Sequence, residues 1–198
     1  MEEGAEEKAA RRTLIDVLGT LPDPRSPHGR RHPLGAVLGL AVCAMLCGAR
    51  SLYAIAQWGR DQGSPMAKAL GFTRDRTPCV STLHDLFSRL DRERFEAMLG
   101  GWLQEQGLEG AVAVDGKRLR GIHGEQIPGV HLVAAYSHTL GTVVGQQAVP
   151  EQGNELSAVA GLLEQLELAG LVVTGDAQFT QRAVCRSVVE KGGTTSWP

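Results

Sequence analysis

Apolar positions follow two different periods along this chain of 198 residues, and the change falls between residues 104 and 111. Before it, apolar residues recur every three or four positions, which predicts amphipathic helices. After it, short runs of small and β-branched apolar residues predict strands bounded by turn residues. We therefore expect an α+β protein with a helical domain over residues 1–104 and a second, strand-containing domain over residues 111–193.

Capping residues and glycines place the expected helices of the first domain. The pattern predicts a short helix ended by Gly19, a buried helix within residues 33–49, a helix from Ser51 to Gly59, and a hairpin of two helices that start at Thr77 and Asp91. Residues 63–76 read as a loop. The run 33–49 carries no charge, but it barely reaches the length of a membrane span and contains glycines, so we expect a buried helix and no membrane partner.

The second domain reads as three antiparallel strands, a helix, a strand and a helix. The strands are expected at residues 111–114, 130–137, 142–149 and 171–174, with helices starting at Asn154 and covering 180–191. A right-handed crossover would return the fourth strand to lie beside the first.

The stretch 111–121 concentrates the candidate chemistry. Asp115 follows four apolar residues, so a carboxylate lies where a core strand meets water, and carboxylate oxygens are ligands that divalent cations prefer. The cations that follow it, Lys117, Arg118 and Arg120, suit a phosphate-bearing substrate. A strand that ends in an Asp-Gly turn with solvated basic residues explains this stretch equally well.

A second carboxylate, Asp176, follows the apolar part of the fourth expected strand. If the first and fourth strands are neighbours, Asp115 and Asp176 face each other at adjacent strand ends and repel unless a cation lies between them. A pair of Mg²⁺ ions would neutralise them and support phosphodiester cleavage.

Composition changes this picture little, but charge distribution adds one feature. The apolar fraction of 42%, the charged fraction of 21% and the net charge of −2 are ordinary for a globular protein. Residues 25–60 nevertheless hold five arginines and no acid, and Arg30 and Arg31 form a cationic cluster that suits DNA phosphates. A solvated loop is the alternative. The four cysteines form no CxxC pair and no leader precedes them, so we expect buried thiols in a reducing cytoplasm.

Several longer motifs carry a family resemblance. They are the segments 21–25 (LPDPR), 29–34 (GRRHPL), 51–58 (SLYAIAQW), 114–117 (VDGK), 119–121 (LRG), 154–155 (NE) and 173–177 (VTGDA). Together they resemble the insertion-sequence DDE transposases of the H-repeat-associated group, over nearly all of residues 12–193.

The resemblance implies a helical, transposase-associated DNA-binding domain followed by an RNase H-like catalytic domain. It implies that Asp115 and Asp176 match the first two acids of a metal-binding triad, with Mg²⁺ or Mn²⁺ as cofactor. It further implies DNA strand cleavage and transfer at the ends of the element and in target DNA, in the cytoplasm and associated with the nucleoid. The expected DNA-binding residues are Arg30, Arg31, Lys117, Arg118 and Arg120.

The C-terminal residues depart from the family pattern. No residue matches the third acid, a glutamate, and residues 194–198 look like an aberrant tail, which leads us to expect a truncated and catalytically impaired copy. The strand 171–174 would then lack an outer neighbour, and such an edge favours aggregation, dimerisation or pairing with an intact transposase.

Two further functions fit parts of the sequence. A third possibility is that the protein is a non-functional relic without a selected role. A non-catalytic DNA-binding fragment could occupy element ends and repress the intact transposase. A metal-dependent phosphohydrolase of the haloacid dehalogenase type would use the Gly-Asp at residues 175–176, but it requires a second Asp two residues after its nucleophile, where this chain has Lys117.

Overall fold

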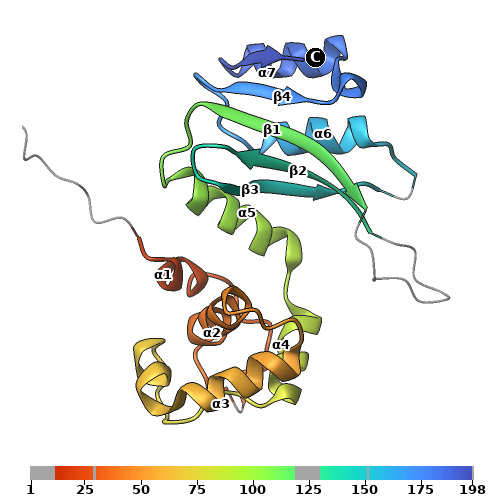
Figure 1. Cartoon of the computed structure of the whole chain (residues 1–198). Helices are drawn as coiled ribbons and strands as arrows, with labels where there is room; N and C mark the ends of the chain where they lie inside the picture. Colours follow the sequence, from red (N-terminus) through yellow and green to blue (C-terminus); the bar gives the residue numbers. More distant parts are fainter. Residues whose placement is uncertain (1–11, 29, 119–129, 151, 198) are drawn as a thin grey trace, which may run out of the picture. The chain divides into compact units, whose positions relative to one another are not determined.

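Helices fill the first half of the chain, and a sheet with two helices fills most of the second half (Figure 1). The structure is a computed structural model, and it describes residues 12–28, 30–118, 130–150 and 152–197. The chain divides into two compact units, here called the N-terminal unit (to residue 99) and the C-terminal unit (from residue 100). No helix in these described ranges is both long and apolar enough to cross a membrane.

Five α-helices are described before the sheet: α1 (Leu14–Leu18), α2 (Leu34–Leu46), α3 (Leu52–Ala69), α4 (Val80–Arg89) and α5 (Arg92–Gln104). The core of the N-terminal unit forms around α2, because nine of the 13 residues of this uncharged helix are buried. Leu83 and Leu86 of α4 complete this core, at the helical spacing that the sequence predicts.

Two helix boundaries differ from the sequence prediction. Helix α3 continues through Gly59, which lies against Leu40 and Thr77 so closely that a Cβ there would be 3.0 Å from each side chain. The helix kinks instead at Gly63, whose φ of +70° is accessible mainly to glycine. Helix α4 is capped by Cys79 rather than Thr77. The Asp91 cap of α5 is confirmed, since its Oδ1 accepts the Arg94 N–H at 3.0 Å.

The C-terminal unit contains a five-stranded mixed sheet in the order β3-β2-β1-β4-β5. Its elements are β1 (Ala111–Arg118), β2 (His131–Ser137), β3 (Thr142–Ala148), α6 (Glu155–Glu164), β4 (Val172–Gly175), the 3₁₀ turn η1 (Ala177–Phe179), α7 (Arg182–Glu190) and β5 (Thr194–Ser196). Strands β1 to β3 form an antiparallel meander, and β4 lies parallel to β1. The α+β class and the predicted return of the fourth strand beside the first are confirmed.

The outer edge of β4 is covered, which corrects the expectation of an unpaired edge. Residues 194–196 form β5 and pair with β4 in parallel register, from Val172↔Thr194 to Thr174↔Ser196. The indole N–H of Trp197 donates to Cys185 Sγ at 3.3 Å, and its ring packs against the hydrophobic core of the C-terminal unit, here called the second core. The predicted cause of aggregation or dimerisation is therefore absent from this edge.

Helices α6 and α7 pack on the same face of the sheet, and the second core lies between (Figure 1). Val112 and Val114 of β1 are buried on this face. Because side chains alternate along a strand, Ala113 and Asp115 point to the opposite face. The helix-covered face thus supplies stability, while the other face of β1 presents its polar residue to solvent.

Candidate functional site: two aspartates at neighbouring strands

The parallel register of β1 and β4 brings the two predicted aspartates to adjacent positions. The last registered pair is Val114↔Gly175; Asp115 is the next residue of β1, and Asp176 directly follows the end of β4, with an extended backbone before η1. Asp115 lies two positions beyond Ala113 and therefore shares its face of the sheet, and Asp176 follows Thr174 at the same spacing where β4 ends. Residues 61 positions apart in the sequence are therefore neighbours in the fold.

Gly175 permits the close approach of the two strands immediately before the aspartates. A Cβ at this position would lie 2.9 Å from the Val114 carbonyl oxygen and 2.9 Å from the Trp197 ring, so any larger residue would push the strands apart. Both aspartates are exposed, and neither carboxylate has a hydrogen-bond or ion-pair partner among the residues that the structure describes. Their oxygens are accordingly available to a ligand.

Strand β1 does not end at Asp115, which corrects the expected strand 111–114 and its Asp-Gly turn. It continues through Gly116 and Lys117, which pair with Val133 and Leu132 of β2. Gly116 leaves room for Glu155 of α6, because a Cβ on this glycine would lie 3.0 Å from the Glu155 carboxylate. The glycine thus serves the packing of a carboxylate behind the strand.

Glu155 links three elements around the aspartates, and the sequence interpretation assigned it no role. Its Oε1 lies 2.7 Å from His131 Nε2 at the start of β2. Its Oε2 accepts a hydrogen bond of 2.6 Å from Gln178 in η1, two residues after Asp176. Glu155 therefore ties the end of β1, the start of β2 and the turn behind Asp176 together. The signal in the sequence was its place directly after the Asn154 cap.

The donor set at the two strand ends suits a hard divalent cation. Carboxylate oxygens are the preferred ligands of Mg²⁺, which is usually held by one or two carboxylates together with waters and substrate phosphates. Across the ranges that the structure describes, no three His, Cys, Asp or Glu side chains gather in a way that could hold a metal ion. The two aspartates are thus the candidate metal ligands, and no third His, Cys, Asp or Glu of the described residues joins them.

The predicted DNA-binding cations lie in both units. Lys117 is exposed and, two residues after Asp115, shares its face of the sheet. Arg118 ends β1, but its side chain and the whole of Arg120 lie outside the described residues. In the N-terminal unit, Arg31 is exposed, whereas Arg30 donates to the Arg25 carbonyl oxygen and lies 3.6 Å from the Asp23 carboxylate.

Two family models match the chain, one for each half. The model described as "DDE_Tnp_1-associated" matches residues 15–103. The model described as "Transposase DDE domain" matches residues 106–196, which include both aspartates.

Curated relatives match nearly the whole chain, although it spans only part of their length. The "Uncharacterized protein in dhlA 3'region" of Xanthobacter autotrophicus is 32% identical over 87% of this chain and 60% of its own length. The "Putative transposase YncI" of Escherichia coli K12 is 31% identical over 90% of this chain and 74% of its own. The "H repeat-associated putative transposase YhhI" of the same strain is 25% identical over 91% and 49%.

Among solved structures, a piggyBac transposase in a synaptic complex with hairpin DNA aligns with 93% of this chain and 47% of its own. The TM-score is 0.42 and the sequence identity 10%.

Proposed function

Since the chain belongs to the DDE transposase family, we propose that it acts in DNA transposition by Mg²⁺-dependent cleavage and transfer of DNA strands. Mn²⁺ would serve as the alternative metal. DNA is the partner, both at the ends of the element and at the target. Family membership supports the role in transposition, and the geometry at the two strand ends supports the chemistry.

One observation carries the proposed mechanism: Asp115 and Asp176 both follow the pair Val114↔Gly175 of two parallel neighbouring strands. Neighbouring strands lie about 4.8 Å apart, which is within the span that a shared metal ion or a pair of ions bridges. Two exposed carboxylates without protein partners are unfavourable neighbours at neutral pH, and metal binding removes their repulsion.

Each residue near the strand ends has a separate proposed task. Asp115 and Asp176 hold the metal through their carboxylate oxygens, and Lys117 contacts a phosphate of the DNA from the same face of the sheet. Glu155 holds the strand ends and η1 in place from the other face. The bound metal supplies activation of the attacking water or hydroxyl and stabilisation of the leaving oxygen. Because no third His, Cys, Asp or Glu of the described residues joins the two carboxylates, we expect these residues by themselves to hold the metal weakly.

A second candidate function is occupation of element ends without cleavage. The observation that favours it is a basic pocket formed entirely by residues of the N-terminal unit, which contains neither aspartate. Such binding would not require a metal ion, and it would repress an intact transposase by competing for its sites.

An electrophoretic assay with DNA that carries the element's ends separates the two functions. Transposition chemistry predicts nicked or joined products with MgCl₂, none with chelator, and none with Asp115→Asn or Asp176→Asn. Glu167→Gln, an exposed position in the connection between α6 and β4, is the matched control and should cleave normally. A metal-independent band shift without any product in MgCl₂ would favour the repressor and refute the cleavage mechanism.

A further inference from the structure

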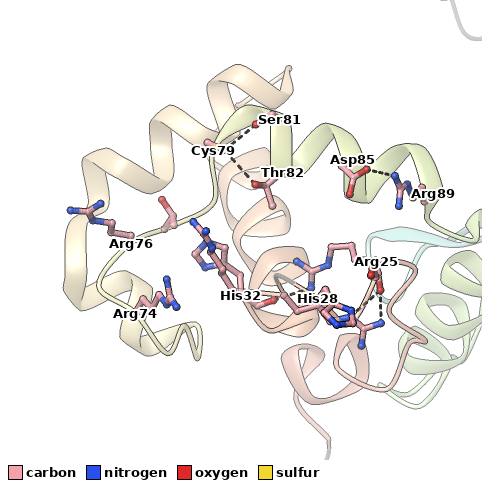
Figure 2. A pocket seen from close by; sticks show the side chains of 14 residues that line it. Arg25, His28, His32, Arg74, Arg76, Cys79, Ser81, Thr82, Asp85 and Arg89 are labelled. Carbon is pink, nitrogen blue, oxygen red and sulfur yellow. Dashed lines mark hydrogen bonds and ion pairs between the residues drawn. The ribbon is translucent and has the colours of Figure 1, made fainter.

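Basic side chains of the N-terminal unit surround an open pocket of about 730 Å³ (Figure 2). Three segments line it: the loop residues 25–28 and 30–32, the segment 74–79 before α4, and α4 itself. The lining contains six arginines and two histidines, against a single acidic side chain, that of Asp85. Figure 2 shows Arg74 and Arg76 on the segment before α4, and His28 and His32 on the loop.

Half of these arginines are used by the fold. Arg25 is buried, donates to both carboxylate oxygens of Asp23 at 2.9 and 2.8 Å, and also donates to the His32 carbonyl oxygen. Arg30 bonds to the same turn through the Arg25 carbonyl oxygen. Arg89 pairs with Asp85 at 2.8 Å, which also neutralises the one acid of the pocket.

The other three arginines carry charge that the described protein does not neutralise. Arg31, Arg74 and Arg76 are exposed and form no ion pair with any residue in the described ranges. Two of them lie close enough to affect a neighbour: burial, and then the charges of Arg25, Arg74 and Arg31, lower the pKa of His32. Arginine side chains that line one pocket suit phosphate oxygens, which a guanidinium group binds through two parallel hydrogen bonds.

We infer that this pocket binds successive phosphates of a DNA backbone through Arg31, Arg74 and Arg76. The inference rests on the proposed function for the choice of DNA and adds to it a surface of the N-terminal unit. Three unpaired guanidinium groups around an opening of this volume suit several phosphates of a polymer better than one buried small anion. Contacts of this kind position the protein on the duplex and do not read its sequence.

Binding measurements at several salt concentrations test the inference with any DNA duplex. The full chain, in chelator, is titrated into a fluorescein-labelled duplex of about two helical turns, long enough for one protein. The variant carries Arg31→Ala, Arg74→Ala and Arg76→Ala together. The control carries Arg50→Ala, Arg92→Ala and Arg94→Ala, which remove the same charge from exposed positions outside the pocket.

Each lost phosphate contact lowers the slope of log K against log salt by about 0.9, so the pocket variant should lose about 2 to 3 units of slope. The control should lose less than about 1 unit, because it loses no direct phosphate contact. Equal losses in the two variants would overturn the inference. Tighter binding to an RNA duplex of the same sequence would also overturn it, since the pocket would then not be a DNA site.

Cys79 gives a second readout that needs no variant. It lines the pocket and is exposed, whereas the exposed Cys47 does not line it. With DNA at about ten times the dissociation constant, alkylation of Cys79 should slow about tenfold. Alkylation of Cys47 should be unchanged, and equal rates for Cys79 with and without DNA would overturn the inference.

The pocket and the proposed catalysis fail separately. If the protein cleaves DNA in MgCl₂ but the pocket variant does not change the salt slope, DNA binding by the pocket is overturned and the proposed function stands. Pocket-dependent binding with no cleavage would support the pocket and count against the proposed function.

Discussion

Removing one of the two aspartate charges should stabilise the metal-free protein and abolish its response to magnesium. We consider Asp115→Asn, which keeps the shape of the side chain. Asp115 and Asp176 follow the same strand pair, and neither carboxylate makes a hydrogen bond or ion pair within the described residues. The substitution therefore removes repulsion without removing a bond.

The magnitude follows from the spacing of the strands. Two unit charges about 5 Å apart repel by about 0.8 kcal/mol in water, and the exposure of both side chains argues for this high-dielectric limit. Asp115→Asn should thus raise the free energy of unfolding by up to about 1 kcal/mol in chelator. Magnesium binds only the folded site, so MgCl₂ at ten times its dissociation constant should add about 1.4 kcal/mol to the unsubstituted protein.

Urea denaturation, followed by circular dichroism in chelator and at rising MgCl₂, measures both effects. KCl at matched ionic strength corrects for screening, and Glu167→Gln serves as the control because it removes an exposed charge in the connection between α6 and β4. Asp176→Asn should behave like Asp115→Asn. The reasoning is refuted if Asp115→Asn destabilises the protein in chelator and still gains stability from magnesium.

Three further predictions concern residues around the two sites. Gly175→Ala should lower the free energy of unfolding in urea by about 1–3 kcal/mol, because its Cβ would meet Val114 and Trp197 at 2.9 Å. Gly101→Ala, which has nothing within 4 Å of its Cβ, should be neutral or stabilising. Equal effects of the two substitutions would contradict the close packing of β1 and β4. Glu155→Ala should lower the free energy of unfolding by about 2 kcal/mol, because it loses charged hydrogen bonds that are partly screened by solvent. Glu164→Ala on the same helix should have little effect. Unaltered stability of Glu155→Ala would exclude the proposed role of Glu155 in linking β2 and η1. Hydrogen bonds from Ser81 and Thr82 lower the pKa of Cys79 from 9.0 to about 6. The rate of its reaction with iodoacetamide should therefore rise with pH to half its maximum near pH 6, and Ser81→Ala should move that midpoint upward. A midpoint near pH 9 in the unsubstituted protein would contradict these hydrogen bonds.

Local patterns sufficed to predict most of the elements and the aspartate pair. The spacing of Leu83 and Leu86 and the cap at Asp91 depend on neighbours in sequence, and the structure has them as predicted. The apolar runs at residues 111–114 and 171–174 predicted strands β1 and β4, although β1 continues to Arg118. The adjacency of Asp115 and Asp176 then followed from the handedness of one crossover connection.

Features that depend on tertiary packing were not predictable in this way. Gly59 reads as a helix end, yet it lies inside α3 because α2 approaches closely there. Residues 194–196 lack a strand pattern and pair only because β4 offers an open edge. Arg74 and Arg76 read as ordinary loop residues, and only the fold brings them around the same pocket as Arg31.

The position of a bound metal ion tests the central claim most directly. Crystals of the protein soaked in MnCl₂ would be measured at the manganese absorption edge, where an anomalous peak locates the ion. The account predicts a peak within about 2.2 Å of a carboxylate oxygen of both Asp115 and Asp176, or two peaks about 3.5–4 Å apart between them. Carboxylates that point apart, with manganese bound elsewhere on the molecule, would contradict it.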